Sequence, residues 1–338
     1  MRDTPLVQSH GQRIACDDGV VDLVWVGDVL AIALAGGAVQ LVGAGSEMSV
    51  APHRRAILCA CVHPDGCSVV TGGDDGFVRR VALDGAVSDL GCFDQKWVHA
   101  LTSSAESGVL VAAVGRDAMI WPRGSAAPSH TFGFGSTIGG LSLDAKGKRL
   151  AVSHYNGATV LYPLVAASGR VRLERGGSHL ACTISPDCGY LITALQETGL
   201  HGWKLPAKMQ LSMSGYPAKT RSFSWSHRGR WLATSGSVNA VIWPFTGKTG
   251  PMEKEPLVMG GRADAIVTQV AFHPTGEHLA LGHSDGAVSL VRIDDGAAVP
   301  IDAPALSITA LQWSKDGHKL AYGDEGGRVG ILDMTVRA

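Results

Sequence analysis

A repeat of about 41 residues runs through nearly all of this 338-residue chain. Segments that begin at residues 57, 98, 138, 179, 220, 267 and 308 align with one another, at intervals of 40 or 41 residues except for one of 47. A weaker copy at 20–42 precedes them and brings the number of units to eight. A repeat of this length indicates a propeller or a solenoid, in which each unit completes its core against its neighbours.

Each unit has the pattern of a β-meander. In FHPTGEHLALGHSDGAVSLVRI, residues 272–293, a Pro/Gly turn leads into an apolar run, and a Ser-Asp-Gly turn leads into the next. Short apolar runs joined by such turns are typical of β-hairpins, and no stretch shows a sustained helical pattern. The segments between units have room for a fourth, outer strand. The chain's only asparagines, Asn156 and Asn239, fall at second turns, where we expect a positive φ.

These motifs resemble the WD40-repeat β-propeller family, in a bacterial-type form with degenerate WD motifs. The resemblance covers residues 12–338, and three motifs carry it best: Phe272-His273-Pro274, Asp285-Gly286-Ala287-Val288 and Val241-Ile242-Trp243. It implies an all-β fold, a single propeller domain over 1–338, with four-stranded antiparallel blades, eight in number or alternatively seven. The Trp-Asp pair that names the family is missing. We therefore expect its buried Asp-His-Ser-Trp hydrogen-bond network to be incomplete in most blades.

The last unit ends at its third strand and leaves no segment for a fourth. Residues 12–17, with Gln12–Cys16 as the strand, are expected to complete the last blade and close the ring. Closure removes an open sheet edge, which would otherwise be free to pair with another chain.

Residues 282–286, Gly-His-Ser-Asp-Gly, match the G-x-S-x-G nucleophile elbow of serine hydrolases. That elbow needs a helix after the serine, whereas the run that follows here, AVSLVRI, is a strand pattern. Ser284 is interpreted as a turn residue, and the sequence predicts no catalytic residue.

The chain also contains cysteines and histidines that could bind a metal, but their spacing matches no metal-binding motif. Cys59, Cys61 and His63 fall on one face of a strand, yet the matching positions in other units hold mostly small residues, which favours packing between blades. His154 and His283 share a column at the second turn, and solvated histidines are expected there. The sequence predicts no metal site and no cofactor.

Composition narrows the class of partner. The net charge of −1 provides no basic face for a nucleic acid or an anionic membrane, and the first residues show no apolar signal segment. The odd number of cysteines, seven, lacks disulfide or zinc spacing and predicts free thiols in the cytoplasm.

The resemblance implies a non-catalytic scaffold that binds a partner protein or peptide on a rim made by the inter-unit loops and second turns. An acidic peptide is favoured if the rim arginines converge. The alternative is a propeller that binds a metal or small ligand in its central channel, an enzyme among the options. The predicted partner-binding residues are Arg54, Arg55, Trp97, Arg116, His154, Arg221, Arg262 and His283.

Overall fold

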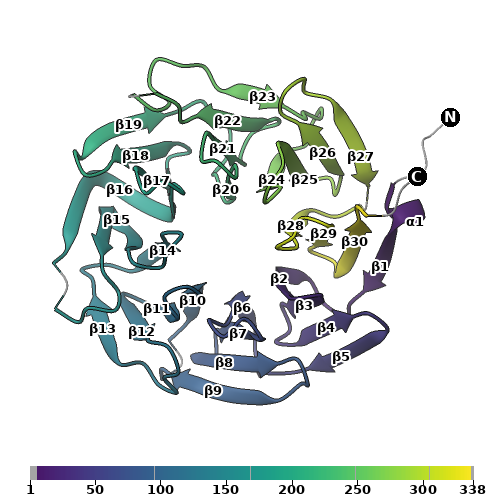
Figure 1. Cartoon of the computed structure of the whole chain (residues 1–338), viewed down its shortest axis with the longest axis horizontal. Coiled ribbons are helices and arrows are strands. Elements are labelled where there is room, and N and C mark those ends of the chain that lie inside the picture. The colour runs from purple at the N-terminus through teal and green to yellow at the C-terminus, as the bar shows by residue number, and fades with distance from the viewer. Residues whose placement is uncertain (1–5, 95, 168, 248, 304, 336–338) are drawn as a thin grey trace. The chain divides into compact units, whose positions relative to one another are not determined.

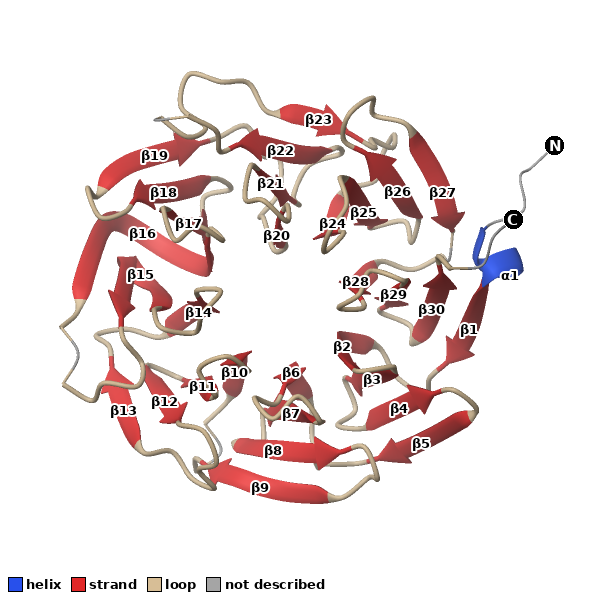
Figure 2. Ribbon diagram, viewed as in Figure 1, coloured by secondary structure: helices blue, strands red, loops and turns tan. Residues whose placement is uncertain are grey.

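The computed structural model describes residues 6–94, 96–167, 169–247, 249–303 and 305–335. Within them the regular secondary structure is almost entirely β-strand, and the described helix is the short α1 (Leu6–His10) (Figure 2). The chain divides into two compact units, one made of Met1–Trp25 with Gly215–Ala338 and the other of Val26–Ser214. Each described sheet is antiparallel, as the repeat pattern predicts.

The unit of Val26–Ser214 carries the sheets β2–β5, β6–β9, β10–β13 and β14–β19, with β2 crossing the boundary at Trp25 (Figure 1). The strands are β2 (Val20–Val26), β3 (Val29–Leu34), β4 (Val39–Gly43), β5 (Ser46–Val50), β6 (Ile57–Val62), β7 (Ser68–Gly73), β8 (Phe77–Ala82), β9 (Val87–Cys92), β10 (Val98–Ser104), β11 (Val109–Val114), β12 (Asp117–Trp121), β13 (His130–Gly133), β14 (Ile138–Leu143), β15 (Leu150–Leu161), β16 (Val171–Ile184), β17 (Tyr190–Leu195), β18 (Leu200–Lys204) and β19 (Met209–Met213).

The other unit carries three four-stranded sheets, β20–β23, β24–β27 and β28–β30 with β1. Their strands are β1 (Gly11–Ala15), β20 (Phe223–Trp225), β21 (Trp231–Thr234), β22 (Ala240–Pro244), β23 (Leu257–Met259), β24 (Val267–Phe272), β25 (His278–His283), β26 (Val288–Arg292), β27 (Ala298–Asp302), β28 (Ile308–Trp313), β29 (Lys319–Asp324) and β30 (Arg328–Asp333). The expected fourth strands between units are present as β5, β9, β13, β19, β23, β27 and the first part of β16.

The described sheets number seven, six of four strands and one of six, whereas eight blades was the main expectation and seven the alternative. The difference arises at β15 and β16. Over 150–154, β15 pairs with β14, and over 155–160 it pairs with β16, which in turn pairs with β17 from His179 onward. Because these two strands continue through positions where other units have turns, the repeats at 138–164 and 179–213 share one hydrogen-bonded sheet.

The N-terminal strand completes the last sheet, as predicted, although it is Gly11–Ala15 and begins one residue earlier than expected. Its order is β1-β30-β29-β28, with five residue pairs between β1 and β30. Arg13 forms an ion pair with Asp302, with 2.6 Å between Nη2 and Oδ1, and Asp302 also accepts a hydrogen bond from Tyr322. Val7 of α1 is buried in the same apolar cluster as Tyr322 and Leu332.

Small residues on the first strands mark where neighbouring sheets meet within a unit. Cys59 Sγ donates to the carbonyl of Val98, and Ser103 Oγ donates to the carbonyl of Val62. In the other unit Ser222 Oγ accepts from the amide of Val270 at 3.1 Å. This confirms the interpretation of the Cys59 position as a packing position.

The second turns confirm one asparagine prediction and correct the other. Asn156 has φ +65° and is followed by Gly157 at φ +134°. Asn239 does not have a positive φ; in its turn the positive value belongs to Gly236, at +98°. Glycine carries no Cβ and adopts this backbone at lower cost, so the asparagine is not needed for it.

The loops before first strands lie beside the second turns of the same sheet. The amide of Asp74 donates to the carbonyl of Ala56, that of Gln196 to Ser178, and that of Ser284 to Ile266. We call this end of each sheet, formed by those loops and second turns, the rim. The first turns, which contain Lys146, Arg228 and Lys315, lie at the opposite end of the strands.

Candidate functional site

The structure places six of the eight predicted partner-binding residues on the surface of the rim. Arg54 and Arg55 lie in the loop before β6, Arg116 lies at the second turn before β12, and Trp97 lies before β10 with 62% of its surface exposed. Arg221 and Arg262 are exposed in the unit of residues 215–338. Trp97 is the most exposed of the large apolar side chains among the described residues, which confirms its separation from the core tryptophans.

His154 and His283 are not solvated, contrary to expectation. Their exposures are 8% and 0%; His283 is the last residue of β25, whereas His154 lies within β15, which continues to Leu161. His154 contacts the carbonyl of Tyr155 through Nδ1 and Thr159 Oγ1 through Nε2, each at 2.9 Å. Neither ring nitrogen of His283 has a hydrogen-bond partner among the described residues. His283 presents no surface that a docked partner can contact directly, and His154 presents only a small one.

The predicted arginines divide between the two units. Arg54 and Arg55 belong to the unit of Val26–Ser214, whereas Arg221 and Arg262 belong to the other. Arg55 pairs with Asp74 at 3.4 Å, and Arg262 pairs with Asp285 at 2.9 Å. Their convergence into one four-arginine cluster stays a prediction.

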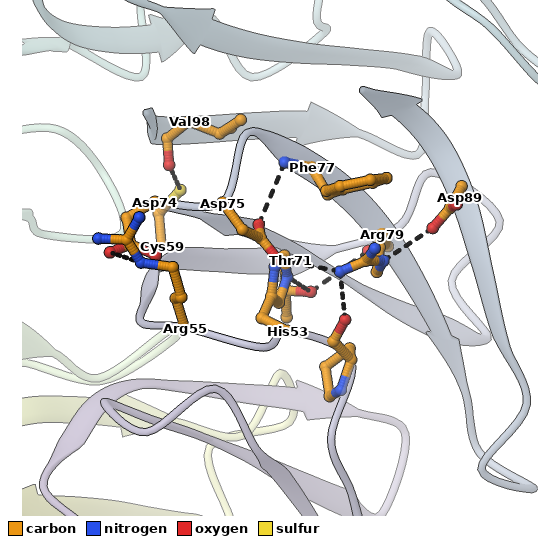
Figure 3. A network of polar contacts seen from close by, with 11 residues as sticks. His53, Arg55, Cys59, Thr71, Asp74, Asp75, Phe77, Arg79, Asp89 and Val98 are labelled. Carbon is orange, nitrogen blue, oxygen red and sulfur yellow. Dashed lines mark hydrogen bonds and ion pairs between the residues drawn. The ribbon is translucent and has the colours of Figure 1, made fainter. Parts of the chain in front are cut away.

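A polar network fixes the loop that carries Arg54 and Arg55 (Figure 3). His53 is buried, with Nε2 2.9 Å from Thr71 Oγ1 and Nδ1 2.9 Å from Asp75 Oδ1. Asp75 also pairs with Arg79 at 3.1 Å. A Cβ at Gly73 would overlap the His53 ring, so a glycine is needed beside it. The loop is therefore attached to β7 and to the second turn, so the backbone that carries its two arginines is held in place.

The charges in this network are set by burial and pairing. Burial lowers the pKa of His53 below its ordinary value, although the carboxylate of Asp75 acts in the opposite direction. For Asp75, burial acts to raise the pKa, but hydrogen bonds from His53 and from the Phe77 amide, with the charge of Arg79, outweigh it and leave the pKa lowered. Asp75 is thus ionised at neutral pH and orients both His53 and Arg79.

Two other sheets hold buried hydrogen-bond networks related to the Asp-His-Ser-Trp network of WD40 repeats, but with different residues. Tyr216 contacts Thr234 at 2.6 Å and accepts a hydrogen bond from Trp243 Nε1 at 2.6 Å. His179 Nδ1 lies 2.7 Å from Thr193 Oγ1. These networks lack the full set of aspartate, histidine, hydroxyl and tryptophan, in keeping with the expectation of incomplete ones. Sequence reasoning missed Tyr216 because a tyrosine does not match the family's histidine.

A pocket of about 840 Å³ opens at the rim between β13 and the first part of β16. His154 lies in its wall, and the ring of Phe134 packs on His154 with 5.7 Å between centroids. The amide of Phe134 donates to the carbonyl of Arg116, so two predicted rim residues adjoin the pocket. Its other charged walls come from Arg170, Arg172, Glu174 and Arg175, none of which was predicted. The run R-V-R-L-E-R at 170–175 was the available signal, because it holds three arginines and one acid within six residues.

Ser284 is a turn residue, as predicted. Its amide donates to Ile266, its Oγ accepts from the Ile266 amide at 3.0 Å, and Gly286 follows with φ +84°. The chain continues from this turn into β26, a strand.

Replacement of Ser284 by alanine should change stability little, by about 1 kcal/mol, since one exposed hydrogen bond is lost. A serine-directed fluorophosphonate should leave the protein unlabelled, as intact-mass spectrometry can measure. Stoichiometric labelling that disappears in Ser284→Ala would refute the turn interpretation.

The two cysteines and the histidine of 59–63 do not converge on one point. His63 Nδ1 pairs with Asp65 at 2.9 Å, while Cys61 packs in an apolar cluster with Trp121. Across the described ranges, no group of three or more His, Cys, Asp or Glu side chains is arranged to hold a metal ion. None of the seven cysteines, all of which lie in the described ranges, forms a disulfide. No helix within the described part of the chain is both long and apolar enough for a membrane span.

The antiparallel four-stranded blades define an all-β propeller. A crystal structure of the computationally designed Ika8 protein is similar, with a TM-score of 0.77 and 15% identity over 94% of this chain and 97% of that one. At this identity the likeness concerns the fold alone.

Sequence comparison adds the family. The family model described as "WD domain, G-beta repeat" matches residues 46–79 and 255–291. Human WD repeat-containing protein 35 is 21% identical over 42% of this chain and 12% of its own length. WD repeat-containing protein SL1-17 of Schistosoma mansoni is 27% identical over 46% of this chain and 47% of its own length. The matches thus span less than half of either relative. Both relatives are WD repeat proteins and two segments match the repeat model, which supports the resemblance to the WD40-repeat family.

Proposed function

We propose that this protein is a non-catalytic scaffold that binds a partner protein or peptide on its rim. The observation that carries the proposal is Trp97, a large aromatic side chain 62% exposed in a loop between two well-packed strands. Exposed tryptophan and arginine are the side chains that most often supply interface energy. Similarity to WD repeat proteins supports a binding role in general, because such proteins generally bind protein partners.

The rim favours a protein partner of acidic character. Arg54, Arg116 and Arg221 are exposed, and a guanidinium pairs with a carboxylate in bidentate fashion. The net charge of −1 and cysteines that form no disulfide support a protein ligand in the cytoplasm over a nucleic acid or a membrane surface.

Affinity purification followed by mass spectrometry identifies the partner, and variants then test the rim. Trp97→Ala and Arg221→Glu should each weaken capture about tenfold or more, a loss of about 1.4 kcal/mol or above. The melting temperature should barely change, because both side chains lie in exposed loops.

Lys146→Glu and Lys315→Glu are the controls, since both side chains are exposed at the opposite end of the strands. Both should bind as the unchanged protein does. Capture that is lost in these controls and kept in Trp97→Ala would place the binding surface at the opposite end.

A further inference from the structure

The pocket beside β16 has an excess of positive charge that no described carboxylate neutralises. Arg170, Arg172 and Arg175 line it together with one acid, Glu174. None of the three arginines forms an ion pair with an acidic residue in the described part of the chain, unlike Arg55 and Arg262 at the rim. Uncompensated arginines in a concave site favour an anionic ligand.

The arginines are held in place by the fold. The Arg170 guanidinium lies over the rings of Phe132 and Phe134, 5.5 and 5.4 Å from their centroids, and donates to the carbonyl of Gly133 at 2.7 Å. Arg175 donates to the carbonyl of Gly176 at 2.7 Å. Arg172 is opposite Thr159 in the β15–β16 ladder and is exposed. Pairing with a ligand anion therefore requires little further ordering of Arg170.

The site has the geometry of an extended chain. Arg172 lies in β16 and Arg170 comes directly before its first residue, Val171. In extended backbone, positions two apart are separated by about 6.6 Å, which is also the distance between alternate side chains of an extended peptide. Over 171–174, β16 pairs with β15 and with no other described strand, so one backbone edge is open. An open edge can accept a strand from a partner through main-chain hydrogen bonds.

We propose that this pocket binds an extended acidic segment of the partner protein, with acidic residues at alternate positions facing Arg170 and Arg172. Tyr155, 57% exposed, and Phe134 would contact the apolar parts of the same segment. This inference rests on the proposed function, because the acidic segment is taken to belong to the protein that binds the rim. It depends on residues other than Trp97 and Arg221.

The test measures fluorescence anisotropy with a labelled heptapeptide in which glutamate alternates with threonine. The full-length protein should bind it, and a peptide with glutamine in place of glutamate should bind at least tenfold more weakly. Added salt should weaken binding, because the attraction is ionic and exposed to solvent.

Two variants and a matched control locate the site. Arg172→Glu and Arg175→Glu should each reduce peptide affinity about tenfold or more, and Arg172→Lys should reduce it less, since lysine keeps the charge but loses the planar fork. Arg228→Glu makes the same charge change at an exposed first turn and should bind normally. Unaltered melting curves confirm that the variants are folded.

Equal affinity for the glutamate and glutamine peptides, or unchanged binding by Arg172→Glu, would overturn the proposal. Full displacement of the peptide by equimolar inorganic phosphate would also overturn it, since the pocket would then be a small-anion site. A negative peptide result with partner capture still lost in Trp97→Ala rejects this inference alone. Capture that is lost in Arg172→Glu but kept in Trp97→Ala and Arg221→Glu rejects the Trp97 surface alone.

Discussion

A chain that begins at residue 19 should unfold with a free energy lower by roughly 5 kcal/mol or more than that of the full chain. The deletion removes the buried side chains of Val7 and Ile14, each contributing about 2 kcal/mol. It also removes Arg13 and leaves the carboxylate of Asp302, 8% exposed, without its ion-pair partner, which costs about 3 kcal/mol. Denaturant unfolding followed by circular dichroism measures the difference.

A chain that begins at Leu6 is the matched control, because it keeps α1 and β1. It should unfold like the full chain. The shortened protein should in addition form dimers or larger aggregates, since β30 then presents an unpaired edge. Equal stability of the two truncated proteins would show that β1 does not hold the last sheet together.

Acidification from pH 6.5 to pH 4 should lower the free energy of unfolding by several kcal/mol. Burial lowers the pKa of His201 and of His283 to about 4, from 6.5 in an unfolded chain, with Arg175 lowering the first further and Arg262 the second. Within this window the unfolded state binds protons that the folded state does not, so stability falls as pH falls. Each histidine contributes about 3 kcal/mol over the window, and above pH 6.5 the loss disappears.

His283→Leu should flatten this dependence by about 3 kcal/mol while leaving the fold intact at neutral pH. Leucine suits the position, because Leu195 occupies the equivalent place opposite the first strand in its own sheet. His227→Leu, at an exposed histidine, is the control and should keep the full pH dependence. Superposed stability curves for His283→Leu and the unchanged protein would contradict the assignment.

The fold was predictable because the repeat fixes it many times over. A hairpin such as 272–293 shows its turns and alternation in the sequence, and each copy confirms the next. The number of sheets was not predictable. The sequences of β15 and β16 resemble the other repeats and do not show that these two strands run on without a break where other units have turns. The helix α1 was missed for a related reason, since five residues are too few to show a helical period.

The candidate site was predictable only as far as the rim. Trp97 is identified as exposed by its place between two units, because an inter-unit loop offers no core to bury it. His154 and His283 were placed correctly in the sequence but oriented wrongly, since a column of residues at a strand end does not show which way each side chain turns. The pocket of Arg170 and Arg172 depends on the approach of β13, which lies some forty residues earlier and shares no motif with them.

The pairing of β1 with β30 has a consequence for how the chain is made. Arg13 and Asp302 are 289 positions apart. During translation β1 is therefore synthesised first and stays unpaired until β30 has been made. Contacts of such long range form slowly, because the loop entropy must be lost before the pairing is gained. The last sheet should therefore be the late step of folding on the ribosome. Until it forms, β1 remains available to pair with a neighbouring nascent chain, and the growing protein then depends on chaperones.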